Sequence, residues 1–350
     1  MKKIKFKNLI ITILIVALSL MFFAFAAFYS LVVLGVSTKL QTIWICSAMT
    51  TLNHKYLATW FFSDEKIEQV LKENMVDDTG YESDIFVIED KNDEETDEKD
   101  EEKVDPYIEE GYTKLEEGLY MKEVSGSSWR GNIMLIADSK RVKLADTKNQ
   151  FRCGQKVASM IKDNDAVAGI NGGGFVDGPN YDSNGGIPAG MLIENGILIN
   201  PKNANTEDTY NMVGFNKDGV MVLKRCTPAW ALENDIVSAV TFSPYIIVNG
   251  EGTIKKGTGG WGIAPRTAIG QRKTGEVLFL VIDGRQIGWS IGVDLLPVQD
   301  TLLAENCYNA AMMDGGSSTV LIYNDEFVNR PSLGFERYIN NCWIVTKAEE

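Results

Sequence analysis

Residues 191–200 read MLIENGILIN, in which two runs of three apolar residues are separated by Glu-Asn-Gly. An Asn-Gly pair favours the tight turn that joins two antiparallel strands, because both residues accept positive φ. The same pattern recurs where Asp218-Gly219 separates two apolar runs, and where Asn249-Gly250 follows an apolar run. These turns predict hairpins and therefore a region built from antiparallel strands.

The chain around these hairpins, from residue 107 to 348, consists of short apolar runs broken by turn residues. Helical spacing is rarer: Val157, Met160 and Ile161 indicate one helix, and a second begins near Asp294. The predicted fold class is α+β, made mostly of antiparallel strands and hairpins with a few helices. One N-terminal transmembrane helix is expected to precede it.

The N-terminal segment predicts that helix. No charged residue occurs between positions 8 and 38, and the apolar run would span roughly 40 Å as a helix, against a hydrocarbon core of roughly 30 Å. Four lysines precede the run and only Lys39 follows it closely, which favours a cytoplasmic N-terminus and an extracytoplasmic remainder. Residues 1–38 are therefore predicted to be an uncleaved single-pass membrane anchor. A cleaved signal peptide is the alternative, since Ala24-Phe25-Ala26 resembles a cleavage site.

The formal net charge of −14 is concentrated in one stretch. Residues 77–110 contain 17 carboxylates and three lysines, and the remaining chain carries 31 basic and 31 acidic residues. Such density predicts a disordered acidic spacer over residues 77–106. The membrane-proximal segment 39–76 is expected to contain a short helix after the N-cap residue Ser63. The acidity argues against a nucleic-acid partner.

The inventory of reactive side chains excludes several chemistries. The single histidine, His54, lies far from every glycine-rich motif, so Ser-His-Asp, Cys-His and common zinc chemistries are disfavoured. The five cysteines show no C-x-x-C spacing. They form either disulfides, which an exported location permits, or isolated buried thiols.

Four glycine-rich strand ends contain the candidate functional residues. Consecutive glycines let backbone N–H groups approach a ligand, strand-end aspartates can face a cleft, and arginines suit phosphate. Each motif alone also fits a plain turn, so the combination carries the prediction. The candidates are Asn171, Gly172 and Gly173; Arg266 and Thr267; Asp283 and Arg285; and Asp314, Gly315, Gly316, Ser317, Ser318 and Thr319.

Taken in this order, the four motifs resemble those of the phosphodiester glycosidase family, to which the lysosomal uncovering enzyme belongs. The resemblance covers roughly residues 107–348 and is strongest over 168–348. Bacterial members of the family are often labelled exopolysaccharide biosynthesis proteins. Gly174 departs from the pattern, because family members usually have an aromatic residue there.

The resemblance implies hydrolysis of a sugar-1-phosphodiester in a cell-surface or extracellular glycan. Asp314 and Asp283 would be the acid/base or water-positioning carboxylates, with their roles unassigned, and Arg266 and Arg285 would hold the phosphate. The other candidates would bind sugar or phosphate oxygens. One aspartate could instead hold a divalent cation, Ca²⁺ or Mg²⁺, through oxygen ligands. The alternative functions are a non-catalytic glycan-binding or exopolysaccharide assembly protein and, ranked last, a stalked adhesin.

Overall fold

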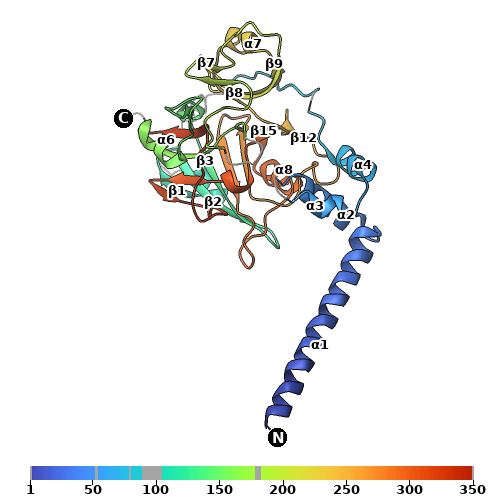
Figure 1. The fold of residues 1–350 in the computed structure, drawn as a ribbon. Coiled ribbons are helices and arrows are strands. Elements are labelled where there is room, and N and C mark those ends of the chain that lie inside the picture. Colours follow the sequence, from blue (N-terminus) through green and yellow to red (C-terminus); the bar gives the residue numbers. More distant parts are fainter. Residues whose placement is uncertain (1, 52–53, 79, 89–104, 178–182, 349–350) are drawn as a thin grey trace. The chain divides into compact units, whose positions relative to one another are not determined.

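The computed structural model describes residues 2–51, 54–78, 80–88, 105–177 and 183–348. The chain divides into two compact units (Figure 1). The first comprises Met1–Met75 with Gly260–Gly262, and the second comprises Val76–Gly259 with Ile263–Glu350. We describe each unit by itself.

The first unit begins with a long apolar helix. Helix α1, Lys2–Phe28, continues into a π-helical turn, Tyr29–Val33. Among the described residues, one helical stretch is long and apolar enough to cross a membrane: Asn8–Val33, with a mean hydropathy of 2.9. The predicted apolar helix is therefore present, and its length fits either a membrane anchor or a signal sequence.

Three shorter helices complete the first unit: α2 (Thr38–Met49), α3 (Tyr56–Thr59) and α4 (Asp64–Asn74). The predicted N-cap of α4 is present, because the hydroxyl of Ser63 accepts a hydrogen bond of 3.3 Å from the backbone N–H of Lys66. Ile67 and Val70 of α4 are buried in a cluster with Ile45 of α2. Helix α4 thus packs on its neighbours and is not an isolated stalk.

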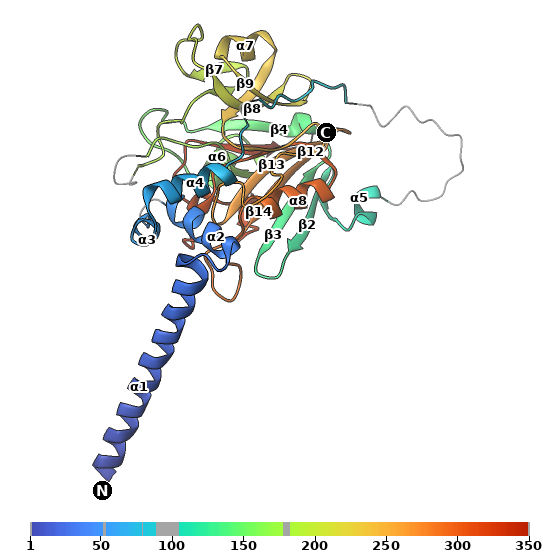
Figure 2. The same cartoon turned by 90° about the vertical axis from the view of Figure 1, so that its right-hand side faces the viewer.

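The second unit contains three sheets (Figures 1 and 2). The strand orders are β1-β2-β3-β14-β13-β15-β11-β12, β7-β6-β10-β8-β9 and β17-β16-β5-β18-β4. Every strand pair in the described part of the chain is antiparallel, which confirms the predicted α+β class.

The strands of the second unit have the following bounds: β1 Thr113–Glu116, β2 Leu119–Ser125, β3 Arg130–Ile136, β4 Val142–Asp146, β5 Ala166–Asn171, β6 Leu192–Glu194, β7 Ile197–Asn200, β8 Tyr210–Asn216, β9 Met221–Cys226, β10 Ile236–Thr241, β11 Tyr245–Val248, β12 Glu251–Gly252, β13 Arg266–Arg272, β14 Val277–Ile282, β15 Cys307–Met312, β16 Leu321–Tyr323, β17 Glu326–Phe327 and β18 Asn341–Thr346. The α-helices are α5 Pro106–Glu109, α6 Val157–Asp163, α7 Pro228–Glu233 and α8 Leu296–Ala304. Short 3-10 turns cover Ser139–Arg141 and Gly316–Ser318.

The predicted hairpins form as expected. Strands β6 and β7 pair across Asn195 and Gly196, whose φ angles are +50° and +74°. The pairs β8–β9 and β11–β12 enclose the other two predicted turns. Both predicted helices are present as α6 and α8. Local turn chemistry therefore determines these connections.

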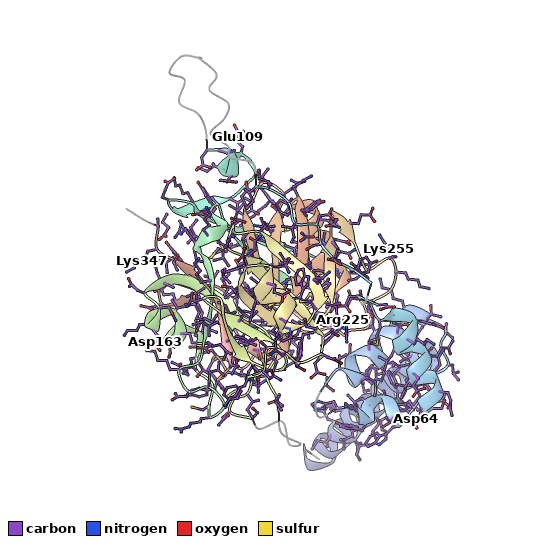
Figure 3. The ribbon with its side chains drawn as sticks, turned by 90° about the horizontal axis from the view of Figure 1, so that it is seen from above. Asp64, Glu109, Asp163, Arg225, Lys255 and Lys347 are labelled. Atoms are coloured by element: carbon purple, nitrogen blue, oxygen red, sulfur yellow. The ribbon has the colours of Figure 1, made fainter. Side chains whose placement is uncertain are left out.

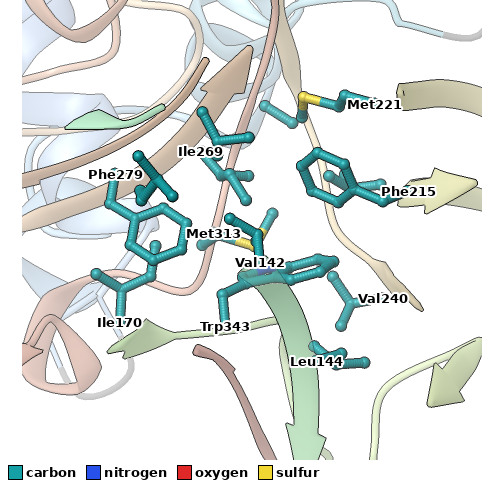
Figure 4. Close-up of a cluster of buried hydrophobic side chains, with 14 of the residues drawn as sticks. Val142, Leu144, Ile170, Phe215, Met221, Val240, Ile269, Phe279, Met313 and Trp343 are labelled. Carbon is teal, nitrogen blue, oxygen red and sulfur yellow. The ribbon is translucent and has the colours of Figure 1, made fainter. Parts of the chain in front are cut away.

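A buried apolar cluster joins the three sheets (Figure 4). Ile269 and Phe279 come from the eight-stranded sheet, Phe215 from one five-stranded sheet and Trp343 from the other. The rings of Phe215 and Trp343 meet edge to face with centroids 5.5 Å apart. Exposed charged side chains such as that of Lys255 lie on the outside (Figure 3). This core holds the ends of β5, β13 and β15 in place.

Residues 76–78 and 80–88, at the start of the predicted acidic spacer, contact the domain. Asp78 is 5% exposed, and its carboxylate accepts hydrogen bonds from the Ser243 hydroxyl at 2.7 Å and the Asn211 amide at 3.1 Å. Ser83 exchanges hydrogen bonds with the backbone of Leu223 in β9. These partners make the first part of the predicted spacer a strap on the domain. Residues 89–104 lie outside the described residues.

All five cysteines lie in the described residues and are free thiols. Four of them are buried, and burial raises the pKa of Cys307 and Cys342. A thiol held protonated in this way is a poor nucleophile. Of the two alternatives, the structure therefore has isolated thiols.

Candidate active site

The ends of β5 and β15 bring two predicted motifs together. The backbone N–H of Asp314 donates to the carbonyl oxygen of Gly172 at 3.1 Å. The Asn171 amide donates to the carbonyl oxygen of Asp314 at 2.5 Å, while its oxygen accepts from the Thr267 hydroxyl at 2.7 Å. These contacts join strands from two different sheets. Asn171 and Thr267 are 1% and 0% exposed, so both support the site from beneath its surface.

The two glycines after Asn171 are required by packing. A Cβ on Gly172 would lie 2.2 Å from the Asn341 side-chain oxygen, and a Cβ on Gly173 would lie 2.9 Å from Val240. The N–H of Gly173 already donates to Asn341 at 2.8 Å. Gly174 has more room, and a Cβ there would lie 3.7 Å from the Phe242 ring. Gly172 and Gly173 are therefore needed for close packing inside the domain, and the N–H of Gly173, which was predicted to contact substrate, is already bonded to Asn341.

Asp314 presents a partly exposed carboxylate at the start of the Gly-Gly-Ser-Ser-Thr loop. One of its oxygens accepts a hydrogen bond of 2.9 Å from the N–H of Gly315. Burial raises the pKa of Asp314; Ser318, Arg337 and the Gly315 N–H act in the opposite direction, and the charge of Asp177 adds to the increase. A carboxyl group with a raised pKa is suited to proton transfer.

The hydroxyl groups that follow Asp314 have different surroundings. Ser317 is partly exposed, whereas Ser318 and Thr319 are 3% and 1% exposed. The Ser318 hydroxyl faces Asp314, whose pKa it lowers, whereas the buried hydroxyl oxygen of Thr319 has no hydrogen-bond partner within the described residues. Unsatisfied buried polar atoms are uncommon and cost free energy, so they are expected beside a site that takes a polar ligand.

Two predicted arginines lie against the loop glycines. Nη1 of Arg266 is 3.7 Å from the position a Cβ on Gly315 would take, and Nη2 of Arg285 is 3.1 Å from the equivalent position on Gly316. Gly316 also has a φ of +62°, which a side chain would strain. Gly316 therefore lets the guanidinium of Arg285 approach the backbone beside Asp314, and Arg266 lies at ordinary contact distance from Gly315.

The two guanidinium groups differ in burial. Arg266 is 4% exposed, and its Nε donates to the carbonyl oxygen of Val293 at 3.1 Å. Burial lowers the pKa of Arg266 to about 10, so it remains charged at neutral pH. Arg285 is exposed, and its guanidinium lies against Gly316. It is the group more available to an anionic ligand.

Asp283 differs from the expectation of a free catalytic carboxylate. It is 3% exposed, and one oxygen accepts from the Asn329 amide at 3.1 Å and from the Arg330 N–H at 2.9 Å. The other oxygen accepts from the Trp289 indole N–H at 2.8 Å. Three donors therefore occupy this carboxylate. The geometry favours Asp283 as a positioning residue for the loop that carries Arg285.

Two charged residues that the motifs did not indicate, Arg337 and Asp177, lie near Asp314. Nη2 of Arg337 is 3.7 Å from a carboxylate oxygen of Asp177, and its guanidinium lies 5.0 Å from the centroid of the Phe175 ring. Both charges act on the pKa of Asp314. No local pattern marks Arg337, because it lies in an irregular loop beyond the recognised motifs. The sequence alone indicates Asp177 only as a carboxylate that lies three residues after the Gly172–Gly174 turn.

No group of three or more His, Cys, Asp or Glu side chains among the described residues is arranged to hold a metal ion. The structure therefore adds no support to the predicted alternative of a Ca²⁺ or Mg²⁺ site. The site contains the carboxylate of Asp314, whose pKa is raised, and the carboxylate of Asp177. It also contains three arginines: Arg266, Arg285 and Arg337. That set can bind a phosphate and transfer a proton next to it.

Comparisons with known proteins identify the family of the chain. The sequence model of a family described as phosphodiester glycosidase matches residues 164–346. The SPbeta prophage-derived uncharacterized protein YomE of Bacillus subtilis is 26% identical over 203 residues, which are 56% of this chain and 30% of that protein. This chain thus spans about a third of the length of that relative.

Two solved structures share the fold. One is the zebrafish N-acetylglucosamine-1-phosphodiester alpha-N-acetylglucosaminidase catalytic domain auto-inhibited by its pro-peptide, with a TM-score of 0.54, 22% identity and coverage of 66% of this chain and 82% of that chain. The other is a putative exported protein from Burkholderia pseudomallei, with a TM-score of 0.50, 14% identity and coverage of 63% and 74%. At these identities the likeness establishes the fold.

Proposed function

This chain belongs to the phosphodiester glycosidase family, and we propose that it hydrolyses the anomeric bond of a sugar-1-phosphodiester in a cell-surface or extracellular glycan. The observation that carries the proposal is the placement of Asp314, whose partly exposed carboxylate lies beside glycines that Arg266 and Arg285 approach. A proton-transfer group and two phosphate-binding groups thereby share one loop.

The chemistry requires little from the protein beyond these groups. Water attacks the anomeric carbon, the bond from that carbon to the phosphate oxygen breaks, and the electron pair leaves with the phosphate monoester. Arg285 and Arg266 stabilise the negative charge that develops on the leaving group. Because a phosphate monoester is a good leaving group, the reaction depends mainly on activating the water.

Asp314 takes the proton of that water in this proposal. Burial raises the pKa of Asp314, which makes its carboxylate a stronger base than an ordinary aspartate. Asp177 and Arg337 adjust this basicity in opposite directions. Asp283 holds the loop of Arg285 through Trp289 and Arg330. The products are a reducing sugar and a phosphate monoester.

The site is proposed to act outside the cell, tethered by α1. Four lysines precede the apolar helix, which favours an N-terminus in the cytoplasm. Protease added to intact cells should then remove the second unit. Protection of that unit in intact cells, with digestion only after lysis, would contradict this location.

The reaction is tested with full-length protein in detergent and the methyl phosphodiester of N-acetylglucosamine 1-phosphate, a probe chosen from the name of the zebrafish protein. Parallel reactions use the glucose and galactose analogues. In ¹⁸O-labelled water, cleavage at the anomeric carbon places the label in the sugar, whereas cleavage at phosphorus places it in the phosphate. We expect label in the sugar. Binding of these probes without any turnover would instead support a glycan-binding module.

A further inference from the structure

A cavity of about 430 Å³ adjoins the candidate active site and has no role in the reaction described above. We propose that it binds the second sugar of an oligosaccharide 1-phosphodiester, next to the sugar whose anomeric bond breaks. This inference rests on the proposed function and narrows its substrate class from monosaccharide to oligosaccharide. We call the cavity the loop pocket; it is lined by Lys156, Ser183, Asn184, Leu333, Phe335, Glu336, Arg337 and Tyr338.

Arg337 connects the loop pocket with the active site. It lines the pocket, and its Nη2 lies 3.7 Å from Asp177, while its guanidinium lies 5.0 Å from the Phe175 ring. The carbonyl oxygen of Gly172 accepts a hydrogen bond from the N–H of Asp314. Phe175 and Asp177 follow Gly172 closely in the sequence. Arg337 therefore lines the pocket and also carries a charge that acts on Asp314, which places the two beside one another.

The composition of the loop pocket fits a sugar. Phe335 and Tyr338 are each 57% exposed, and exposed aromatic groups of this kind mark ligand-binding grooves. One face of a pyranose ring carries C–H groups that pack on an aromatic ring, while its hydroxyls need hydrogen-bond partners. Lys156 and Ser183 supply such partners at the pocket wall, and the Ser183 hydroxyl, which accepts from the Gly185 N–H at 3.0 Å, can still donate. The Asn184 amide is already bonded to Arg152 and Gly186 and shapes the wall. A lipid would not need these polar groups.

The loop that carries the aromatic residues is held in place. Glu336 accepts a hydrogen bond of 3.2 Å from the N–H of Ala158 in α6. Gln155 and Ile339 exchange two backbone hydrogen bonds of 2.9 Å. Gly185 approaches so closely that a Cβ would lie 2.4 Å from the carbonyl oxygen of Tyr338. The pocket is therefore formed before a ligand binds, which lowers the entropic cost of binding.

The positions of the arginines indicate which part of the substrate reaches the pocket. Arg266 and Arg285 approach Gly315 and Gly316, whereas Arg337 pairs with Asp177. With the phosphate at the first two arginines and the anomeric carbon at Asp314, the glycan extends from the cleaved sugar toward Arg337. The pocket thus takes the sugar on the side away from the phosphate.

The test compares the methyl phosphodiester of N-acetylglucosamine 1-phosphate with disaccharide analogues that carry an added hexose on O3, O4 or O6. We expect full-length protein to prefer at least one disaccharide in kcat/KM. The double variant Phe335→Ala, Tyr338→Ala should lose about tenfold for that disaccharide, and change less than about twofold for the monosaccharide. Phe327→Ala removes another exposed aromatic ring, on β17, and should change neither.

Equal rates for the monosaccharide and all three disaccharides would overturn the proposal, as would an equal loss for both substrates in the double variant. If no substrate is hydrolysed, the proposed function is wrong, and the proposal that the loop pocket binds a sugar is then tested by measuring binding. Calorimetry with the same compounds should show tighter binding of one disaccharide, which the double variant loses. Equal binding of all four compounds to the unaltered protein would refute the pocket separately.

Discussion

Replacing Asp314 with asparagine removes a negative charge and little else. The asparagine oxygen can still accept the 2.9 Å hydrogen bond from the Gly315 N–H, and the side chain has nearly the same shape. The backbone contacts of residue 314 with Gly172 and Asn171 are unaffected by the change. The variant therefore separates the charge of Asp314 from its place in the fold.

The expected loss of activity follows from the role assigned to the charge. A base that accepts the proton of the attacking water contributes on the order of 100-fold or more to turnover, which is about 2.7 kcal/mol of transition-state free energy. A turn aspartate with no chemical role would cost about 1 kcal/mol or less, and its effect would appear as reduced stability.

The stability of the variant should change in the opposite direction from its activity. Burial raises the pKa of Asp314, so the folded state binds the proton more tightly than the unfolded chain. The stability contribution of this group is then present at low pH and is lost as the pH rises through the raised pKa. At pH 7 the asparagine variant should be at least as stable as the unaltered protein, measured by urea unfolding.

The assay measures release of reducing sugar, with Asp218→Asn as the matched control. Asp218 also precedes a glycine in a turn but is exposed on the β8–β9 hairpin, so its variant should keep full activity. Near-native turnover by Asp314→Asn would refute the assignment of the base. A large loss of folding stability at pH 7 would refute the argument from burial.

Three further outcomes follow from the site. The carboxylate of Asp283 accepts hydrogen bonds from three N–H donors, and in Asp283→Asn the new amide N–H₂ would face at least one of them. We therefore expect the free energy of unfolding, measured in urea, to fall by about 1–3 kcal/mol; an unchanged value would contradict the positioning role of Asp283. Arg337→Gln should move the acidic limb of the kcat/KM profile to higher pH and Asp177→Asn should move it to lower pH, because their charges act in opposite directions on the pKa of Asp314; shifts in the same direction would exclude Asp314 as the titrating base. Asp78→Ala should destabilise the second unit by about 1–3 kcal/mol because buried donors lose their acceptor, whereas the exposed variant Glu326→Ala should stay within about 0.5 kcal/mol; equal effects would show that the strap does not stabilise the domain.

Most of the secondary structure could be predicted from short stretches of sequence. The hairpin at Asn195-Gly196, the N-cap at Ser63 and the helix containing Met160 all depend on residues close together in the chain. A turn or a cap is decided by φ preferences and hydrogen bonds within a few residues. The apolar helix α1 is predictable for the same reason, because its composition alone determines its hydropathy.

The tertiary structure decided what each polar residue does. Asn171 and Asp283 have the same motif context as Asp314, yet their side-chain oxygens are occupied by Thr267 and Val320 in one case and by Asn329, Arg330 and Trp289 in the other. These partners are distant in sequence, except Trp289, which is six residues away.

Asp78 shows the same limit outside the site. Its surroundings in the sequence are acidic and predict a solvated spacer, but donors from Asn211 and Ser243 bury it. Arg337 was missed because only the fold brings it to Asp177. Whether a carboxylate is free for chemistry depends on which donors reach it, and long-range packing delivers those donors. Local composition therefore determined the elements of this protein, and only tertiary contacts determined which of its aspartates remained available to a substrate.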